Sequence, residues 1–593
     1  MSTIQKSKQN IVNKINRILG AKTVQESDLV LPPKPEMGDF SFPCFNLAKD
    51  LSSQGGQGKA PNEIAKDLAS KIKSCSTVKS IEAVGPYVNF KLQTKKLTQG
   101  VLGEIDKDYG KINLSKDKIL IEYATPNTHK AFHIGHLRNI ITGESIARIL
   151  ANAGYKVIKV NYQGDIGMHV AKCIWHIINN DRELKIFQNR IKNLVKDKQL
   201  IEQAEFLGNA YAKGSVKFET SKKAQAEIKE LNQRIYGNDE SIRKIYNETR
   251  KWSLKYFDKI YKRMGSKFDK FYFESETFKN GKQIVMEGVK KGIFKNSQGA
   301  IIFEGAKHGL HDRVFINSEG NPTYEGKDMA LAKLQLADYN PAKIFHVVSK
   351  EQTEYFKVIF KAMEYVLPKS KGKQEHLVYG WVSLKDGKMS SRLGNVILGE
   401  WLLDEVKKEI SKIVKKSDIK NKPSQTDSRA GKEDLAEKIS LASVKYSILK
   451  NGRASDISFD IKESINLFGN SGPYLQYTYA RIQSILRKSE SQKVRKSKVI
   501  DFESINKYEY KLIFKLSLFP EITQSSAEKL DPSIIAKYLF ELSQEFNDYY
   551  HQIPILKADS KEEKEFRLAL INKIAIVLNR GVELLGFETV EKM

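Results

Sequence analysis

The stretch Pro126-Asn127-Thr128-His129-Lys130-Ala131-Phe132-His133-Ile134-Gly135-His136 joins two segments of different pattern. Before it, residues 119–123 read Ile-Leu-Ile-Glu-Tyr, a short apolar run that predicts a buried strand. After it, residues 137–141 open a pattern whose apolar positions follow the helical period. Two histidines separated by Ile-Gly therefore stand at a turn from a strand into a helix.

The residues of this turn suit a bound phosphate. The start of a helix offers unpaired backbone N–H groups and partial positive charge, and Gly135 lets a phosphate come close to the backbone. His133 and His136 add imidazole N–H groups that can donate to phosphate oxygens. The pattern predicts a nucleotide triphosphate site, with an ordinary pair of surface histidines as the alternative, because so short a string also arises by chance.

A second phosphate-binding candidate lies far downstream, in residues 382–395, which read VSLKDGKMSSRLGN. Glycines, small hydroxyl residues and cations predict a mobile loop that folds over phosphates during reaction, with Lys388 and Ser390 at its centre. A solvated turn rich in cations is the alternative. The combination of both segments in one chain is more specific than either segment alone.

Composition sets broad limits. The chain has 593 residues, too many for one core, and its 40% hydrophobic and 29% charged content is typical of globular proteins. The net charge of +28 fits a polyanionic partner, but lysines are spread along the whole chain, so charge alone does not decide this. No apolar run is long enough to span a membrane. Cys44, Cys75 and Cys173 are far apart, which argues against zinc and disulfides and fits a reducing cytoplasm.

The first unit comprises residues 1–112 and mixes helical periods with a turn and an alternating strand at residues 84–92. Residues 1–20 carry apolar residues at helical spacing, with cations and no acid. They fit a mitochondrial presequence or the first helix of the domain, and we prefer the helix because a globular pattern follows without a spacer.

The second unit, residues 113–425, predicts a Rossmann-type domain with a parallel sheet. A second strand is expected at residues 155–161, and a charged, aromatic-rich helical insertion at about 181–265. Strands of the sheet are expected to resume at residues 300–303 and 343–348. Residues 421–434 contain no large apolar residue and predict a flexible linker. Residues 436–593 form a third unit, helical nearly throughout, and a charged loop is expected at 488–498.

Together the two signature segments resemble those of class I aminoacyl-tRNA synthetases, and the chain resembles the arginyl-tRNA synthetase family over almost its whole length. The resemblance rests on residues 122–136 and on further segments with family-like sequences: 38–40, 85–90, 161–169 (NYQGDIGMH), 472–481 (GPYLQYTYAR) and 584–593. It implies a multidomain α/β protein with an additional α/β N-terminal domain, a Rossmann catalytic domain and an all-α anticodon-binding domain.

The resemblance also implies the chemistry. A ligase of protein biosynthesis would activate L-arginine with ATP and Mg²⁺ and transfer it to the 3′ end of tRNA(Arg), as a cytoplasmic monomer without zinc. The implied catalytic residues are Lys130, His133, Gly135, His136, Lys388 and Ser390. Ser391 replaces the second lysine of many class I loops, and Lys130 would supply the missing charge.

The resemblance implies six arginine-binding residues: Glu122, Asn127, Glu274, Tyr324, Asp328 and Gln352. A guanidinium offers five fixed donors and needs a carboxylate and a flat surface. Tyr324 and Asp328 are four residues apart, so they share a face of a helix, although such a pair can also be ordinary local packing. Glu122 has a further alternative, as a buried strand-end residue that only orients Asn127.

In the third unit, Tyr474, Asn547 and Tyr550 are candidates for stacking on and hydrogen-bonding unpaired tRNA bases. Aromatics at helical spacing are more often core residues, so binding of the anticodon region is the firmer prediction. Three other functions stay open: a synthetase for another amino acid, a small-molecule nucleotidyltransferase, and an inactive RNA-binding or regulatory protein. Charging of total tRNA with labelled arginine separates them.

Overall fold

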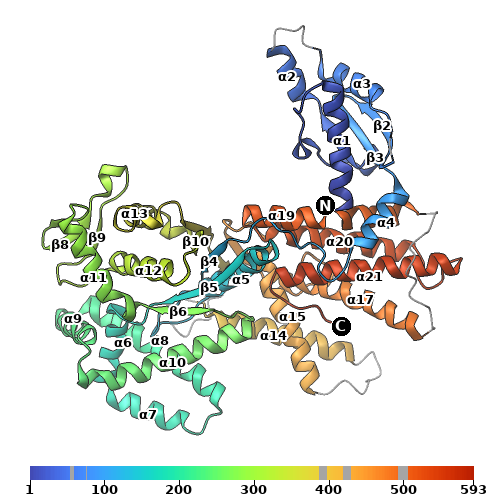
Figure 1. The fold of residues 1–593 in the computed structure, drawn as a ribbon. Coiled ribbons are helices and arrows are strands. Elements are labelled where there is room, and N and C mark those ends of the chain that lie inside the picture. Colours follow the sequence, from blue (N-terminus) through green and yellow to red (C-terminus); the bar gives the residue numbers. More distant parts are fainter. Residues whose placement is uncertain (54–58, 75, 386–396, 419–428, 492–504) are drawn as a thin grey trace.

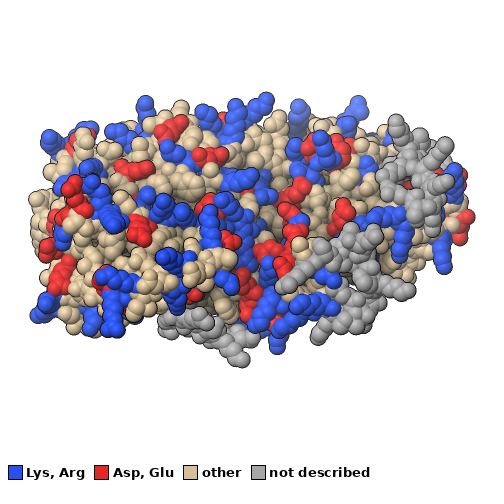
Figure 2. Space-filling view, turned by 90° about the horizontal axis from the view of Figure 1, so that it is seen from below, with Lys and Arg blue, Asp and Glu red and all other residues tan. Residues whose placement is uncertain are grey.

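The computed structural model describes residues 1–53, 59–74, 76–385, 397–418, 429–491 and 505–593. Figure 1 shows a central parallel sheet, an insertion at one side, a helical C-terminal region at the other, and a small N-terminal domain standing on that region. No helix in these ranges has both the length and the hydropathy needed to cross a membrane. Lys and Arg are spread over the whole face shown in Figure 2, with acidic residues between them.

The N-terminal domain is a three-stranded antiparallel sheet covered by helices. Its strand order is β1 (Phe40–Pro43), β3 (Tyr87–Leu92), β2 (Val78–Val84), and its helices are α1 (Thr3–Leu19), α2 (Phe45–Ser53), α3 (Pro61–Lys71) and α4 (Thr94–Glu104). The first helix has a capping box at Ser2 and buries Ile4, Ile11 and Ile15, as expected for a helix of the domain.

The catalytic region is built on a five-stranded parallel sheet, which confirms the predicted Rossmann-type fold. Its order is β11 (Gln374–Tyr379), β10 (Lys343–Ser349), β4 (Lys118–Glu122), β5 (Lys156–Gln163), β6 (Lys270–Phe273). Residues 119–122 are buried, as a central strand covered on both faces requires. α5 (Ile134–Asn152) makes the crossover from β4 to β5 and begins three residues earlier than the apolar pattern indicated.

The insertion lies between two neighbouring strands, β5 and β6. It comprises α6 (Met168–Asn179), α7 (Asp181–Ile191), α8 (Lys196–Thr220), α9 (Lys222–Tyr236) and α10 (Glu240–Met264). The insertion has apolar cores of its own, one of which joins Ile174 of α6 to Ile228 of α9. A separate core explains how this long helical segment packs beside the sheet without belonging to it.

One strand prediction was wrong in its partner. Residues 300–303 do form a strand, β8, but it belongs to a separate antiparallel sheet with β7 (Lys295–Ser297) and β9 (Arg313–Ile316). The turn between β7 and β8 contains Gln298 and Gly299, both with positive φ, and so tight a turn reverses the chain. The two edge strands of the parallel sheet are β11 and β6, and neither was predicted; β6 is a short segment that directly follows the insertion.

The remaining helices of the catalytic region are α11 (Glu274–Lys290), α12 (Tyr324–Tyr339) and α13 (Thr353–Val366), followed by β12 (Val382–Leu384). The C-terminal region contains α14 (Gly399–Asp418), α15 (Arg429–Leu449), β13 (Ile457–Phe459), α16 (Ile461–Ser464), α17 (Gly472–Ser491), α18 (Lys507–Ser517), α19 (Phe519–Lys529), α20 (Ser533–Gln552) and α21 (Lys561–Leu584). β12 pairs in parallel with β13, so the two regions share a small sheet.

Two predictions in this region need correction. Residues 429–434 of the expected linker are the first turns of α15, because that helix packs on α14 and α17 and tertiary contact outweighs the polar composition. Residues 488–491 of the expected charged loop complete α17. The remainder of both segments, residues 421–428 and 492–498, lies outside the described residues.

Candidate functional site

The loop after β4 lies where ligands bind in doubly wound sheets, at the carboxyl ends of the strands. Ala124, Thr125 and His129 have φ values of 74°, 38° and 61°, a left-handed conformation that non-glycine residues rarely adopt. Such a conformation persists only when the surroundings hold it in place, and it is concentrated at functional loops.

His129 anchors this loop to the insertion. It is fully buried, its Nε2 lies 2.8 Å from Thr249 Oγ1, and its backbone N–H donates to Ser253 Oγ over 3.0 Å. Burial lowers the pKa of His129 to about 3, so the ring is neutral. Sequence reasoning assigned no role to this histidine, whose partners lie more than a hundred residues away in α10.

The two signature histidines cap α5 through their side chains. His133 Nδ1 accepts from the Gly135 N–H at 3.1 Å, and His136 Nδ1 accepts from the His133 N–H at 3.2 Å. Burial, helped by Lys130, lowers the pKa of His133 to about 4, and burial also lowers the pKa of His136. Both rings are therefore neutral with Nδ1 as acceptor, which assigns the proton, and the donor function, to Nε2.

The expectation of unpaired N–H groups at the start of α5 was wrong. The N–H of Ile134 donates to Ile397 O at 2.9 Å, that of Gly135 to His133, and that of His136 to His133 O at 2.9 Å. A Cβ on Gly135 would lie 2.9 Å from two ring atoms of His133, so the glycine makes room for the folded-back imidazole. The donors that this turn can offer a phosphate are the imidazole Nε2–H groups.

Lys388 and Ser390 lie outside the described residues, as does Ser391. The described chain leaves for this segment from β12 and returns at Ile397 and Leu398, which contact Ile134 and His133 directly. Both ends of the segment are thus attached close to the start of α5.

Arg138 of α5 holds the outgoing end. It is only 1% exposed, and it donates to the carbonyl oxygens of Trp381, Arg453 and Ser455 at 2.5, 3.1 and 2.6 Å. Burial without a carboxylate partner lowers the pKa of Arg138 to about 10. The signature helix is therefore joined to β12 and to the approach to β13 by one side chain, which sequence reasoning missed.

Lys130 stands beside the signature turn. Its Nζ lies 5.1 Å from the centre of the Tyr211 ring of α8, a cation–π distance. Its charge is one cause of the lowered pKa values of His133 and His136. The insertion thus helps to hold the cation that the sequence assigned to the phosphate site.

Asp328, one of the predicted arginine-binding residues, is a carboxylate without a cationic partner among the described residues. Its Oδ2 accepts from the Tyr355 hydroxyl at 2.7 Å, and no residue in the described ranges forms an ion pair with it. Burial, reinforced by the nearby charges of Glu122 and Glu274, raises the pKa of Asp328 to about 8. A cation placed here would favour the ionised form of this carboxyl group.

Glu122, at the end of β4, is buried with both oxygens occupied. Oε2 accepts from Gln335 Nε2 at 2.6 Å, and Oε1 lies 3.1 Å from His346 Nδ1. These partners come from α12 and β10, and the described contacts of Glu122 do not include Asn127. This arrangement favours a role for Glu122 through its charge.

Glu274 forms a buried ion pair that the sequence did not predict. Its Oε2 lies 2.5 Å from Lys327 Nζ, and both side chains are buried. Lys327 also lies 5.7 and 5.3 Å from the rings of Tyr236 and Tyr324. Burial would lower the pKa of Lys327, but Glu274 outweighs it and the pKa is raised. Because Lys327 belongs to α12, the ion pair links that helix to Glu274 at the start of α11.

Gly164 lets two predicted arginine-binding residues converge. A Cβ at this glycine would lie 1.9 Å from Asn127 Oδ1 and 3.1 Å from Glu274 Oε1. The next residue, Asp165, accepts from the backbone N–H and hydroxyl of Ser275 at 2.8 and 2.7 Å. The turn after β5 thereby fixes the start of α11 and, with it, Glu274.

The other two predicted arginine-binding residues lie further out. Tyr324 is the first residue of α12 and is 51% exposed, and Gln352 is exposed in the turn that follows β10. Tyr324 and Asp328 do occupy one helix, as predicted. Within the described ranges, no three His, Cys, Asp or Glu residues gather closely enough to hold a metal ion.

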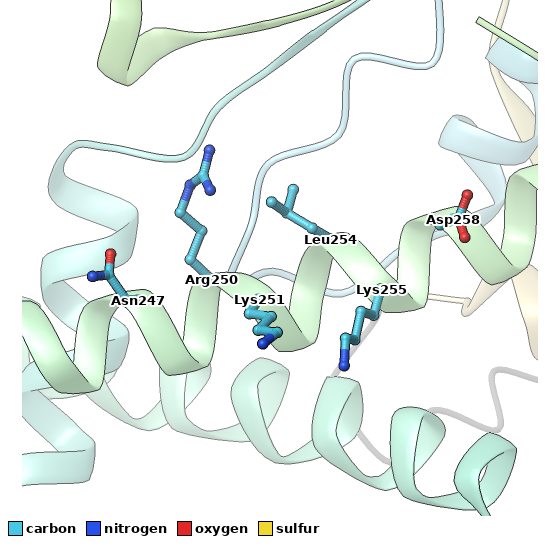
Figure 3. Close-up of a pocket in the computed structure, with 6 residues that line it drawn as sticks. All are labelled: Asn247, Arg250, Lys251, Leu254, Lys255 and Asp258. Atoms are coloured by element: carbon cyan, nitrogen blue, oxygen red, sulfur yellow. The ribbon is translucent and has the colours of Figure 1, made fainter.

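A basic groove adjoins the site between α8 and α10. Two neighbouring hollows share Lys251 and Lys255: one of about 410 Å³ is lined by α10 alone (Figure 3), and one of about 530 Å³ is lined by both helices. Arg250 points from the same helix to the other side, where it pairs with Asp165 at 2.7 Å. The remaining lining residues are Lys196, Gln199, Leu200, Gln203, Asn247, Glu248, Trp252, Leu254 and Asp258.

Comparison with known proteins agrees with this geometry. The family model for the catalytic domain of class I (R) tRNA synthetases matches residues 99–461. The arginine–tRNA ligases of Treponema denticola and Clostridium perfringens are each 33% identical to this chain, over 96% of it and 95% and 96% of their own lengths. The chain belongs to the arginyl-tRNA synthetase family. The family's N-terminal domain model matches residues 5–92, and a DALR anticodon-binding domain model matches 475–593.

Solved structures share the arginyl-tRNA synthetase fold. The Thermus thermophilus arginyl-tRNA synthetase superposes with a TM-score of 0.76 at 23% identity, over 99% of this chain and 100% of that one. The enzyme from Plasmodium falciparum gives the same TM-score at 20% identity. The predicted fold class and family are thus confirmed.

In the anticodon-binding region, the three predicted tRNA residues have different surroundings. Tyr474 is 8% exposed and its hydroxyl accepts from Asn547 Nδ2 at 3.0 Å. Asn547 also bonds Thr478 and Ser543 and accepts from Arg481, so its polar atoms have partners within the domain. These contacts favour the core alternative for Tyr474 and Asn547.

Tyr550 lies on the surface, in a cluster of aromatic residues around Arg481. The guanidinium carbon is 4.6 Å from the ring centre of Tyr477 and 5.1 Å from that of Tyr550. Tyr550 is 38% exposed, and Phe468, whose ring is 6.4 Å from that of Tyr477, is 82% exposed. Exposed aromatic faces around a cation are suited to stacking on unpaired bases.

Proposed function

We propose that this chain attaches L-arginine to tRNA(Arg) in two steps on this site. The arginine carboxylate attacks the α-phosphorus of ATP, pyrophosphate leaves, and a mixed anhydride forms. A terminal ribose hydroxyl of tRNA then attacks the activated carbonyl and AMP leaves. The observation that carries the proposal is one sheet edge with neutral imidazole donors on one side and an enclosed carboxylate lacking a cation on the other. Positioning and charge stabilisation suffice for this chemistry.

The phosphate side would act through four groups. The Nε2–H groups of His133 and His136 donate to the triphosphate, and Lys130 supplies a positive charge held against Tyr211. Lys388, with Ser390, would add the cation of the downstream segment, whose two ends are attached beside α5. Mg²⁺ that accompanies ATP is expected to bind mainly through the phosphate oxygens.

The arginine side would recognise both ends of the amino acid. Asp328 would take two parallel hydrogen bonds from the guanidinium, with Tyr324 beside its plane and Gln352 at the rim. Glu274 and Asn127, which converge at Gly164, would face the α-amino group. Glu122, whose oxygens are bonded to Gln335 and His346, would influence the charge of the site without touching the substrate.

The tRNA would contact two surfaces. The groove with Lys251 and Lys255 offers cations to backbone phosphates next to the site, and the Phe468–Tyr477–Arg481–Tyr550 cluster offers stacking faces in the anticodon-binding domain. For the domains we keep the boundaries 1–112, 113–425 and 436–593. The monomeric state and the cytoplasmic location stay predictions.

The decisive experiment is charging of total tRNA with labelled arginine, with and without ATP. We expect ATP-dependent incorporation of arginine, with lysine and the other amino acids as controls. Charging with a different amino acid, or none with arginine, would overturn the proposed function. Asp328→Asn measured in parallel tests the residue assignment separately from the reaction.

A further inference from the structure

His346 is a buried histidine in the middle of β10 that no part of the proposed reaction uses. It faces Glu122 directly in the parallel register of β10 and β4. Its Nδ1 lies 3.1 Å from Glu122 Oε1, and its Nε2 lies 2.7 Å from Gln374 Oε1 on β11. The rings of Phe356 and Phe360, centred 5.3 and 5.5 Å away, pack near the imidazole.

Both partners of the imidazole are oxygens that accept hydrogen bonds. The Glu122 carboxylate cannot donate, so Nδ1 carries a proton, and Nε2 carries one as well where the Gln374 amide presents its Oε1 to the ring, as it does here. The ring is then an imidazolium. Burial would lower the pKa of His346, but the Glu122 charge and the two hydrogen bonds outweigh it, and the pKa is raised.

With the imidazolium charge on His346 in place, two carboxylates of the arginine side each have a buried cationic partner. Glu122 is compensated by His346, and Glu274 by Lys327. Asp328 has the Tyr355 hydroxyl as its hydrogen-bond partner and no ion-pair partner within the described ranges. One enclosed carboxylate without a counter-ion matches one guanidinium.

We infer that His346 is a specificity-determining positioning residue, because its imidazolium is the resident counter-ion of Glu122 and confines the unpaired negative charge of the site to Asp328. The inference rests on the proposal that Asp328 binds the guanidinium. Without the imidazolium, the Glu122 charge would act unopposed on Asp328, which would then ionise at higher pH and hold arginine less well.

Groups that face His346 from the elements packed around it bear on this titration. They are Glu122 from β4, Asp328 and Gln335 from α12, Gln374 and His376 from β11, and the uncharged rings of Phe356 and Phe360 from α13. His376 bonds the Val348 carbonyl, and burial lowers its pKa to about 4, so it carries no charge near pH 7. Glu122 and Asp328 are therefore the charges that respond to His346.

The test is the pH dependence of the KM for arginine in the full-length His346→Gln variant. Glutamine can still donate to Glu122 but carries no charge. We expect the KM for arginine at pH 7 to rise about tenfold. The low-pH rise of this KM, its acid limb, should begin about one pH unit higher than in the wild type. The KM for ATP should not change. The matched control is His376→Gln on the neighbouring strand, which should leave the limb in place.

An unmoved limb in His346→Gln, or the same shift in His376→Gln, would overturn the inference. If Asp328→Asn itself leaves the KM for arginine unchanged, the proposed arginine site fails instead, so the two failures are distinguishable. Should His346→Gln not fold, ¹⁵N-histidine NMR of the wild-type protein decides. Two protonated ring nitrogens on His346 at pH 7 support the inference, and a neutral tautomer contradicts it.

Discussion

The buried histidines on the phosphate side of the site are neutral, whereas two buried pairs on the arginine side are charged. On the phosphate side, burial holds His133 and His136 neutral, and their hydrogen bonds stay within four residues of sequence. On the arginine side, charges persist as ion pairs between distant elements: Glu122 with His346 and Glu274 with Lys327. A polyanion needs only donors, whereas a cation needs a carboxylate left without a partner, and that requires pairing of every other charge nearby.

The strongest way to break this contrast is Asp328→Asn, which removes the unpaired charge and keeps the shape. We expect the KM for arginine to rise by about 10³–10⁴, because a site built around a buried polar partner rejects its loss heavily. The KM for ATP should change little. Steady-state ATP–pyrophosphate exchange measures both constants, and an unchanged KM for arginine would remove Asp328 from the site.

The phosphate side should respond in rate rather than in binding. His136→Ala and Lys130→Ala should each slow adenylate formation by about 10²–10³, or about 2.7–4 kcal/mol, because such donors act mainly in the transition state. Single-turnover adenylate formation with tRNA present measures this. Transfer from preformed adenylate should stay near the wild-type rate. A change within twofold for Lys130→Ala would identify Lys130 as an ordinary loop residue.

Proton linkage sharpens the same comparison. The pKa of Asp328 is raised to about 8, and arginine needs the ionised form, so binding should improve as pH rises. Below pH 8 the KM for arginine should rise about tenfold per pH unit lowered, and above it the KM should level off. A series of KM values from pH 6 to 9 shows this, with the KM for ATP as the internal control. A flat profile would mean that Asp328 is already ionised.

Arg138→Lys tests whether the two phosphate-binding segments depend on a shared anchor. An ammonium cannot reproduce the planar set of bonds to Trp381, Arg453 and Ser455, so we expect adenylate formation to slow by about tenfold. The matched control is Arg567→Lys, another buried arginine, which pairs with Glu509 and Glu563 inside the C-terminal domain. Equal rate losses in both variants would mean that general destabilisation, read from the melting temperature, is the cause.

The smallest effect is expected in the groove between α8 and α10. Replacing Lys251 and Lys255 together by alanine should weaken tRNA binding a few-fold and reduce the slope of log Kd against log salt by about one to two. Asp258→Asn in the same groove should act in the opposite direction, since it removes a negative charge. Filter binding over a salt series distinguishes the two signs.

The sequence by itself determined the family, the domain types and the residues of the signature turn, because these features are local. A strand, a turn and a helix that follow one another in the chain determine where His133 and His136 lie. The four-residue spacing of Tyr324 and Asp328 determines that they share a face of one helix. Resemblance over the whole chain then supplied the reaction.

Only the tertiary structure decided which charges meet. His346 and Glu122 are 224 residues apart, Arg138 and Ser455 are 317 apart, and no local pattern marks either pair. The same holds for β6, which was missed while β8 was placed in the wrong sheet, because strand pairing depends on how the chain crosses over. The lack of a counter-ion at Asp328 is likewise a property of the folded neighbourhood, because the nearby Lys327 and His346 pair with Glu274 and Glu122 instead.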